Sequence, residues 1–263
     1  MDPCAFDMLF TRSVPNILEK IFLSLDYKSF KACLDVSKTW NELLTADSYR
    51  AKGKLVFHAE LLQEEKKLWN AVIYGNTGKV KNLLSTGMLN VNYVRGCDFR
   101  TPLLEAAYYG QKDVVQLLLD RGADPNKEDA YGWTPLSETQ RCGPDVVQLL
   151  LDRGADPKKT GLCGLTPLHE AVINNQKDVV KMLLNAGAEV DTADAFGRTP
   201  LYCALECMAM YGNKEVVLLL LRKGADHNKP CKDGVSPLRM AEKRGHYDIV
   251  QMLREEGGKK GRV

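Results

Sequence analysis

Apolar residues recur along most of this chain at spacings of three and four, in short stretches that end at glycine. In one unit, Leu103, Ala106 and Ala107 form a first stripe that ends at Gly110, and residues 114–118 (Val-Val-Gln-Leu-Leu) begin a second. Such spacings place side chains on one face of an α-helix. Glycine ends a helix because it accepts the left-handed conformation without a steric penalty. Each unit therefore predicts two short amphipathic helices.

The same unit returns several times. Thr-Pro-Leu begins at residues 101, 134, 166 and 199, and Ser-Pro-Leu begins at residue 236, so the intervals are 33, 32, 33 and 37 residues. Threonine suits the N-cap of a helix, and proline suits the first helical position, where its missing N–H is not needed. Self-similarity at a fixed period of this size indicates stacked repeats. We therefore predict an all-α solenoid, an architecture that offers an extended binding surface.

A period near 33 residues opened by Thr-Pro-Leu resembles the ankyrin repeat. Residues 68–87 keep the apolar pattern of a unit but lack Thr-Pro. An atypical repeat fits the end of an array, because the outer face of a terminal repeat has no neighbour. The resemblance then implies about six repeats over residues 68–256, with short hairpin loops and an atypical first and last repeat.

Three repeats depart from the pattern. Repeat three is one residue short in the turn between its helices and has Thr139 and Gln140 where two alanines are usual. Repeat five has about four additional residues around Glu206–Tyr211, which lengthen a helix or bulge its turn. Repeat two has Phe99 where the turn glycine is expected. Insertions in such arrays often map to the binding side, but tolerated length variants explain them equally well.

In ankyrin proteins, partners tend to contact the hairpin tips just before Thr-Pro and the ends of the inner helices. Aromatic and arginine side chains at these positions suit an interface, because they combine a large apolar area with a polar group. The implied substrate-binding residues are Arg100, Tyr108, Tyr109, Tyr131, Trp133, Leu165, Ile173, Asn174, Phe196 and Arg198, with Lys243 and Arg244 in the last repeat. The alternative for some of the aromatic residues is packing between adjacent loops.

The N-terminal region does not follow the repeat. Pro15 suits a helix start, and the apolar residues from Ile17 to Leu25 recur at spacings of three and four. About fourteen apolar residues fall within a stretch of roughly forty. A segment of this size can bury little surface by itself. The apolar surplus therefore predicts a partner surface, in this chain or in another.

This region resembles an F-box. The family pattern appears as Val14-Pro15, Leu18, Ile21-Phe22, Leu25 and Val36-Ser37-Lys38-Thr39-Trp40, with Val14, Asn16 and Ser37 as departures. F-box proteins dock this motif onto the Skp-type adaptor of cullin–RING ubiquitin ligases. By resemblance, the adaptor-binding residues are Val14, Pro15, Ile17, Leu18, Ile21, Phe22 and Leu25, with Val36 and Trp40 nearer the junction of core and interface. The alternative is a helical cap for the first repeat, which explains the apolar residues but not the spacing of the motif.

These assignments divide the chain into five parts. They are an N-terminal tail (1–12), a three-helix F-box (13–52), a helical connector (53–67), the ankyrin repeats (68–256) and a C-terminal tail (257–263). The connector has no Gly/Ser-rich stretch, so we expect it to be stiff.

Composition narrows the class of partner and the compartment. With 44% apolar residues, 27% charged residues and a net charge of +2, the chain is typical of soluble globular proteins and has no electrostatic footprint for nucleic acid or an anionic membrane. Residues 1–12 make a poor secretory signal, and no apolar run of the repeats is long enough to span a membrane. The eight cysteines form no Cys-x-x-Cys pair, which predicts free thiols in a reducing compartment. We expect a cytoplasmic protein, and basic residues 259–262 leave the nucleus open as a second location.

The sequence predicts no catalytic residue, no cofactor and no metal. His169 begins a segment like a zinc-protease helix, but Ile173 stands where the second histidine is required. His169 follows Thr-Pro-Leu, where the ankyrin family uses the imidazole to hold the preceding loop. Four residues that could be imagined as a zinc site lack the spacing of known zinc fingers: Cys203, Cys207, His227 and Cys231.

Together these features favour a non-catalytic substrate receptor of a ubiquitin ligase. The F-box would bind the Skp-type adaptor, and the ankyrin groove would bind the protein to be ubiquitinated. The second hypothesis is an ankyrin interaction scaffold whose F-box-like helices cap the repeats and have no ligase role. Other ankyrin ligase receptors have a cullin-recruiting box after the repeats, and we do not expect that arrangement, because few residues follow the last predicted helix.

Overall fold

The computed structural model describes residues 61–138, 143–211 and 214–260. Among these residues the regular elements are all helices, and β pairing is limited to an isolated antiparallel bridge between Arg95 and Arg100. This confirms the all-α prediction for the described part. Residues 68–263 form one compact unit, and the arrangement below is that of this unit. The predicted F-box at 13–52 lies outside the described residues, and the domain boundaries remain predictions.

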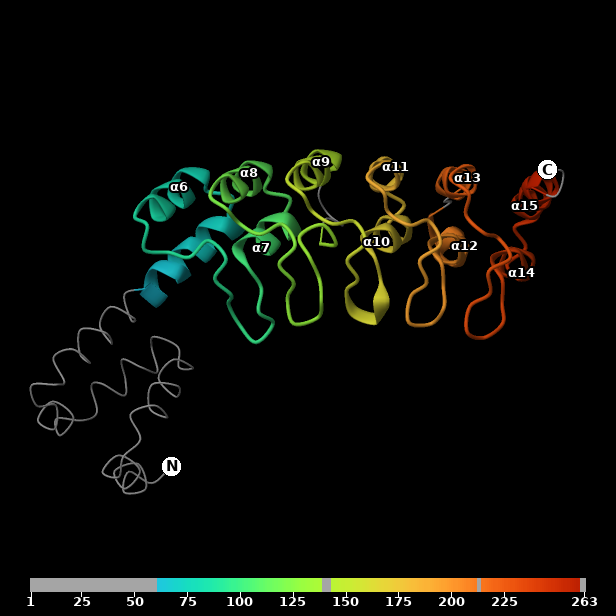
Figure 1. Ribbon diagram of the computed structural model, residues 1–263, viewed down its shortest axis with the longest axis horizontal. Helices are drawn as coiled ribbons and strands as arrows, with labels where there is room; N and C mark the ends of the chain where they lie inside the picture. The colour runs from blue at the N-terminus through green and yellow to red at the C-terminus, as the bar shows by residue number, and fades with distance from the viewer. Residues whose placement is uncertain (1–60, 139–142, 212–213, 261–263) are drawn as a thin grey trace, which may run out of the picture. The chain divides into compact units, whose positions relative to one another are not determined.

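The compact unit has two rows of short helices with loops that extend from one edge (Figure 1). One row contains α6 (Thr77–Ser85), α8 (Lys112–Asp120), α9 (Pro144–Asp152), α11 (Lys177–Asn185), α13 (Lys214–Arg222) and α15 (Tyr247–Lys260). The other row contains α7 (Pro102–Tyr108), α10 (Pro167–Ile173), α12 (Pro200–Tyr211) and α14 (Pro237–Lys243). Residues 61–73 are also helical, and a 3₁₀ turn, η2 (Leu162–Gly164), lies in the loop before α10.

The inner helices are those of the second row, α7, α10, α12 and α14, and the outer helices are those of the first. The inner helices begin at the Thr-Pro pair or its Ser-Pro equivalent. Thr101 is the N-cap of α7 and accepts a hydrogen bond from Leu104 N at 3.2 Å, and Thr166 does the same for α10 from His169 N at 3.3 Å. These bonds satisfy amides that have no partner inside the helix. Gly110 follows α7 with a φ of 65°, which confirms it as the stop between the paired helices.

The core lies between the two rows and continues through the unit as one cluster. Its fully buried large side chains are Leu68, Leu103, Leu104, Leu118, Leu136, Leu150, Leu168, Leu183, Leu201, Leu205, Leu220 and Ile249. Burial of one leucine stabilises the fold by roughly 1.5–3 kcal/mol. Ala106 and Ala107 are also fully buried, and their small side chains let neighbouring helices approach closely.

Two asparagine side chains connect consecutive repeats at the loops that follow outer helices. Asn92 donates to Gly122 O at 3.1 Å and accepts from Asp124 N at 2.8 Å. Asn126 repeats both bonds one unit later, to Gly154 O and from Asp156 N. Each amide therefore closes the loop of the next repeat, which fixes the spacing between units.

The inner segment of repeat three is described only at its start. Residues 135–138 form a turn and a bend rather than a helix. Ser137 N donates to Thr134 O at 3.0 Å, and the hydroxyls of Thr134 and Ser137 lie 3.1 Å apart. Glu138 N also donates to Thr134 O at 3.2 Å, the four-residue spacing of a helical bond. Residues 139–142 lie outside the described part, so the predicted helix of repeat three stays a prediction beyond this turn.

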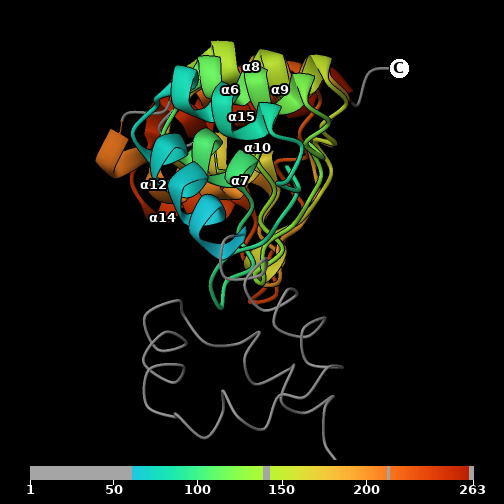
Figure 2. The same ribbon diagram turned by 90° about the vertical axis from the view of Figure 1, so that its left-hand side faces the viewer.

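Repeat five confirms the predicted insertion as a longer helix. α12 has 12 residues, whereas α7, α10 and α14 each have 7. In Figure 2 the orange end of α12 extends beyond the stack of helices.

Phe99 takes the conformation of the glycine that it replaces. Its φ is 53°, and the turn glycines of the following repeats, Gly132, Gly164 and Gly197, have φ values of 78°, 73° and 77°. The left-handed region costs a residue with a β-carbon roughly 1–2 kcal/mol. The turn is thus kept in repeat two at the cost of backbone strain.

We expect Phe99→Gly to stabilise the protein by about 0.5 kcal/mol, because the strain that it relieves exceeds the added freedom of the unfolded chain. The exposed fraction of Phe99 is 56%, so little burial is lost. Thermal unfolding of the full chain measures the effect as a rise in the midpoint. Phe196→Gly is the matched control, since Phe196 is similarly exposed without a positive φ, and its midpoint should fall. A fall for both variants would contradict the strain argument.

Candidate protein-interaction surface

The hairpin tips are joined to one another by backbone hydrogen bonds. Ala130 N donates to Asp98 O at 2.7 Å, Ala195 N to Cys163 O at 2.7 Å, and Lys232 N to Phe196 O at 2.9 Å. Each bond crosses from one repeat to the next. These bonds join the tips of repeats two and three, and those of repeats four, five and six, so the tips within each set do not behave as independent loops.

Buried aspartates fix the side chains at two of these tips. One carboxylate oxygen of Asp129 accepts from Tyr131 N at 2.8 Å and from Trp133 N at 2.9 Å. Asp194 accepts in the same way from Phe196 N and Arg198 N, both at 2.8 Å. Both aspartates are buried. Because the backbone is held on both sides of each turn, the aromatic side chains are presented with little loss of freedom on binding.

Large apolar side chains are exposed along this row. Tyr131 and Phe196, which the sequence places on the partner surface, have exposed fractions of 51% and 54%. Phe99 and Leu162 are equally exposed at 56% and 52%, and the sequence analysis did not include them. Both could have been found, because each puts a large apolar side chain into a tip where neighbouring repeats have glycine or alanine.

Trp133 has a different role from its neighbour Tyr131. It is half-buried, and a β-carbon added to Gly161 would lie 2.6 Å from its Cε3 atom. The indole thus packs against the backbone of the next loop, as the alternative of loop packing anticipates. Leu165 is also half-buried at the corresponding position of repeat four.

The ends of the inner helices add an exposed edge to the surface. Tyr109 is exposed and meets the half-buried Tyr108 ring edge-on, with 5.1 Å between ring centroids. Asn174 is exposed and donates from its side chain to Glu170 O at 2.8 Å, beside the half-buried Ile173. The predicted contacts of the last repeat, Lys243 and Arg244, are exposed as well.

The two arginines of the predicted surface form ion pairs within the chain. Arg100 contacts Glu105 at 2.9 Å and Glu138 at 2.7 Å, and Asp129 lies 3.6 Å away. Burial lowers the pKa of the Arg100 guanidinium, but the hydrogen bonds and charges of Glu138 and Glu105 outweigh it and raise the pKa overall. Arg100 therefore connects repeats two and three.

Arg198 makes its contacts within its own repeat. Its Nε contacts Asp194 at 2.8 Å, its Nη1 contacts Glu206 at 3.0 Å, and the guanidinium covers the Phe196 ring at 5.0 Å. It therefore supports the exposed aromatic side chain beside it.

Three glutamates lie at equivalent positions of repeats two, three and four, two residues after Thr-Pro-Leu, and the sequence analysis did not identify them. They are Glu105, Glu138 and Glu170. Burial raises the pKa of Glu170, and the nearby charge of Glu138 raises it further. The regular recurrence of glutamate after Thr-Pro-Leu was the available signal.

His169 is a structural residue of repeat four. Its Nδ1 accepts from Thr166 N at 3.2 Å, which confirms its contact with the end of the preceding loop. Its Nε2 lies 3.1 Å from Arg198 O, so it also holds the loop of the next repeat. Burial lowers the pKa of the imidazole, which favours the neutral ring that both contacts require.

Three of the described cysteines have raised thiol pKa values. All five described cysteines are free, and burial raises the pKa of Cys203 to about 12. Burial likewise raises the pKa of Cys207, and the Asp98 hydrogen bond and charge raise that of Cys97. Raised pKa values disfavour the thiolate that nucleophilic attack requires. The described part also contains no group of three or more His, Cys, Asp or Glu side chains placed to hold a metal ion.

Comparison with known proteins agrees with the architecture. A family model described as ankyrin repeats in three copies matches residues 68–161 and 136–231. The chain belongs to the ankyrin-repeat family. Ankyrin repeats are protein-interaction modules, so a protein-interaction role follows for this array.

Individual relatives match only through the repeats. The rat protein "Ankyrin repeat and SAM domain-containing protein 6" is 42% identical over 79 residues, which are 28% of this chain and 9% of that protein. "Serine/threonine-protein kinase 12" of Arabidopsis thaliana is 44% identical over 64 residues, which are 24% of this chain and 14% of that protein. "E3 ubiquitin-protein ligase HACE1" of Xenopus tropicalis is 47% identical over 57 residues, which are 22% of this chain and 6% of that protein. The matched region thus spans less than a sixth of each of these three relatives.

No helix within residues 61–138, 143–211 and 214–260 reaches the length and apolar content needed to cross a bilayer.

We expect Arg100→Ala to destabilise the protein by about 2 kcal/mol, because it leaves two largely buried glutamates without their cation. Urea unfolding of the full chain measures the loss. Lys112→Ala is the matched control: the Lys112–Asp145 pair also joins two repeats, but both side chains are more than half exposed, so its removal should cost much less than the loss of Arg100. Equal losses would show that burial does not distinguish the two pairs.

Proposed function

We propose that this chain is a substrate-recognition subunit of a Skp–cullin–F-box ubiquitin ligase. The N-terminal region, residues 13–52, would bind the Skp-type adaptor, and the ankyrin surface would bind the protein to be ubiquitinated. No residue of the chain would be catalytic, and no cofactor would be needed. The role would be that of a non-enzymatic receptor.

One observation supports the proposed binding of a target protein by the ankyrin surface. It is the row of exposed apolar tips, formed by Phe99, Tyr131, Leu162 and Phe196, on a backbone fixed by inter-repeat hydrogen bonds. Exposed aromatic side chains on a rigid frame bury a large area on binding and lose few rotamers. The ion-paired arginines beside them, Arg100 and Arg198, would support the surface and leave the tips as the principal contacts.

The adaptor half rests on the sequence motif. The Val14-Pro15 start, Ile21-Phe22 and the close at Trp40 have the spacing of an F-box, and the segment has more apolar residues than it can bury. The ligase name of the HACE1 relative adds no weight, because the 57 matched residues belong to the repeat region that many unrelated proteins share.

The mechanism would be proximity. A receptor that holds its target and the adaptor at the same time raises the local concentration of target lysines near the ubiquitin-charged enzyme. Such a receptor needs two independent surfaces, and this requirement gives the two tests that follow.

In the first test, Pro15→Ala with Leu18→Ala is expected to abolish co-purification of a Skp-type adaptor from cells, because it removes two apolar contacts of the motif. Affinity purification with mass spectrometry reports adaptor and cargo together. Captured cargo and the thermal midpoint of the repeats should be unchanged. Adaptor recovery at the wild-type level by this double variant would refute the ligase role and favour the scaffold hypothesis.

In the second test, Tyr131→Ala with Phe196→Ala is expected to lower cargo recovery at least tenfold while adaptor recovery stays constant. Both side chains are more than half exposed, so the variant should retain the wild-type thermal midpoint. Lys127→Ala with Lys232→Ala is the matched control: both positions are exposed, Lys127 in the loop of Tyr131 and Lys232 in the loop of the repeat that follows Phe196. Unchanged cargo recovery in the aromatic variant would exclude the tip row as the capture surface.

A further inference from the structure

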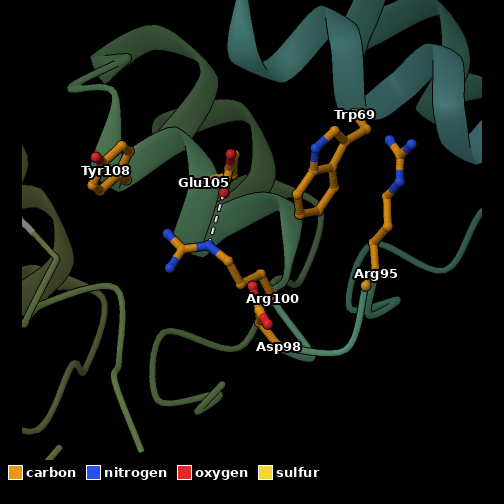
Figure 3. Close-up of a pocket in the computed structure, with 7 residues that line it drawn as sticks. Trp69, Arg95, Asp98, Arg100, Glu105 and Tyr108 are labelled. Carbon is orange, nitrogen blue, oxygen red and sulfur yellow. Dashed lines mark hydrogen bonds and ion pairs between the residues drawn. The ribbon is translucent and has the colours of Figure 1, made fainter. Parts of the chain in front are cut away.

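A pocket of about 500 Å³ lies beside the hairpin of repeat two. It is lined by Trp69, Arg95, Gly96, Asp98, Arg100, Glu105 and Tyr108 (Figure 3). These residues come from helix 61–73, from the hairpin and from α7. The volume is in the range of small-ligand sites and is sufficient for one or two side chains of a bound segment.

The hairpin brings two guanidinium groups to one side of the chain. Arg95 N donates to Arg100 O at 2.9 Å, and the two residues form an isolated antiparallel bridge. Residues that face each other in such a bridge project from the same face. Two like charges in this arrangement are unfavourable unless anionic groups compensate them.

Only one of the two arginines has its charge compensated by an ion pair. Arg100 contacts Glu105 at 2.9 Å and Glu138 at 2.7 Å, whereas Arg95 has no ion pair within 4.0 Å among the described residues. Instead the Arg95 guanidinium lies over the Trp69 ring, 5.4 Å from its centroid. Its Nη1 atom is buried and has no hydrogen-bond partner. A buried donor without an acceptor is unfavourable, so the guanidinium of Arg95 has unused binding capacity.

The view of the pocket shows how the charged and aromatic groups divide it (Figure 3). The Arg95 side chain extends along one side of the Trp69 indole, and Arg100 lies on the other side and points to Glu105. The Arg100 guanidinium covers the Tyr108 ring at 5.4 Å. The indole and the phenol therefore provide apolar walls, and Arg95 provides a cation at one end.

We propose that this pocket binds a carboxylate side chain, Asp or Glu, of the protein segment that the array captures. The segment's carboxylate would take the Arg95 guanidinium from its stacked position on Trp69 and satisfy the Nη1 donor. Arginine suits this role because its planar fork matches a carboxylate in a two-point contact. This inference rests on the proposed capture of a protein segment by the ankyrin surface, and it states the chemistry of part of that segment.

The acidic residues of the pocket select the type of anion. Glu105 is neutralised by Arg100, and Asp98 accepts a hydrogen bond from the Cys97 thiol at 3.0 Å without an ion pair among the described residues. The remaining negative charge of Asp98 opposes a dianion more strongly than a monoanion. The pocket is therefore specific for a carboxylate over a phosphorylated side chain.

The experiment uses the full chain as bait for a displayed library of random dodecapeptides, followed by affinity measurements on synthetic peptides. We expect the recovered peptides to share one acidic position. Replacement of that residue by its amide should weaken binding to the wild-type protein at least tenfold. The Arg95→Gln protein should bind the acidic peptide more weakly than the wild type by a similar factor. Its affinity for the amide peptide should equal that of the wild type. This double comparison isolates the contact between the carboxylate and Arg95.

Arg121→Gln is the matched control, because Arg121 is an exposed arginine at the C-cap of α8 and its loss makes the same change in net charge. It should bind both peptides like the wild type. Phosphoserine in place of the acidic residue should bind more weakly than the carboxylate. The amide peptide provides the test on unaltered protein if Arg95→Gln proves unstable.

Several outcomes would overturn the proposal. They are recovery of no peptides, recovery without an acidic position, equal affinity of the acid and amide peptides, equal affinity of wild type and Arg95→Gln for the acidic peptide, and tighter binding of the phosphoserine peptide. Adaptor recovery from the same protein preparation separates these failures from failure of the ligase role. A chain that recovers the adaptor but no acidic peptide keeps its receptor function and loses this specificity.

Discussion

Stacking of neighbouring repeats is the interaction on which every other feature of this array depends. Most of its helices have seven or nine residues, and helices of this length are marginal in water by themselves. Their stability comes from apolar faces such as those of Leu118 and Leu150, which are covered only when units lie side by side. The asparagine bonds of Asn92 and Asn126 then set the distance between units. A binding surface built on this frame inherits its rigidity.

The charged residues of the surface stabilise the repeats, whereas apolar residues form the part that is free to contact a partner. Arg100 and Arg198 were expected to face a partner, yet both are engaged with carboxylates of the chain. The exposed positions are instead apolar tips such as Tyr131 and Phe196. Pairing of arginines inside the chain lowers the cost of desolvating the surface, because fewer unpaired charges must leave water when a partner binds. Arg95 is the exception in this part of the surface, since one of its buried donors has no acceptor.

The sequence was sufficient for features that depend on local chemistry. Thr101 and Thr166 cap their helices, Gly110 ends one, and the extra residues of repeat five lengthen α12 as one of two alternatives anticipated. Features that depend on contacts between distant residues could not be predicted. The packing of Trp133 on Gly161 and the ion pairs of Arg100 need the stacked geometry of two repeats. Prediction of the pocket beside Arg95 would also require knowing which hairpin residues lie opposite each other.

The turn at residues 135–138 in repeat three has a consequence for the cooperativity of the array. In a linear solenoid, folding free energy is the sum of each unit's own term and its coupling to the two adjacent units. At the junction of repeats two and three, Arg100 supplies a polar contact to Glu138, the residue at the end of the turn. Leu136 of the same turn is buried in the common core, so the coupling at this junction combines apolar burial with an ion pair.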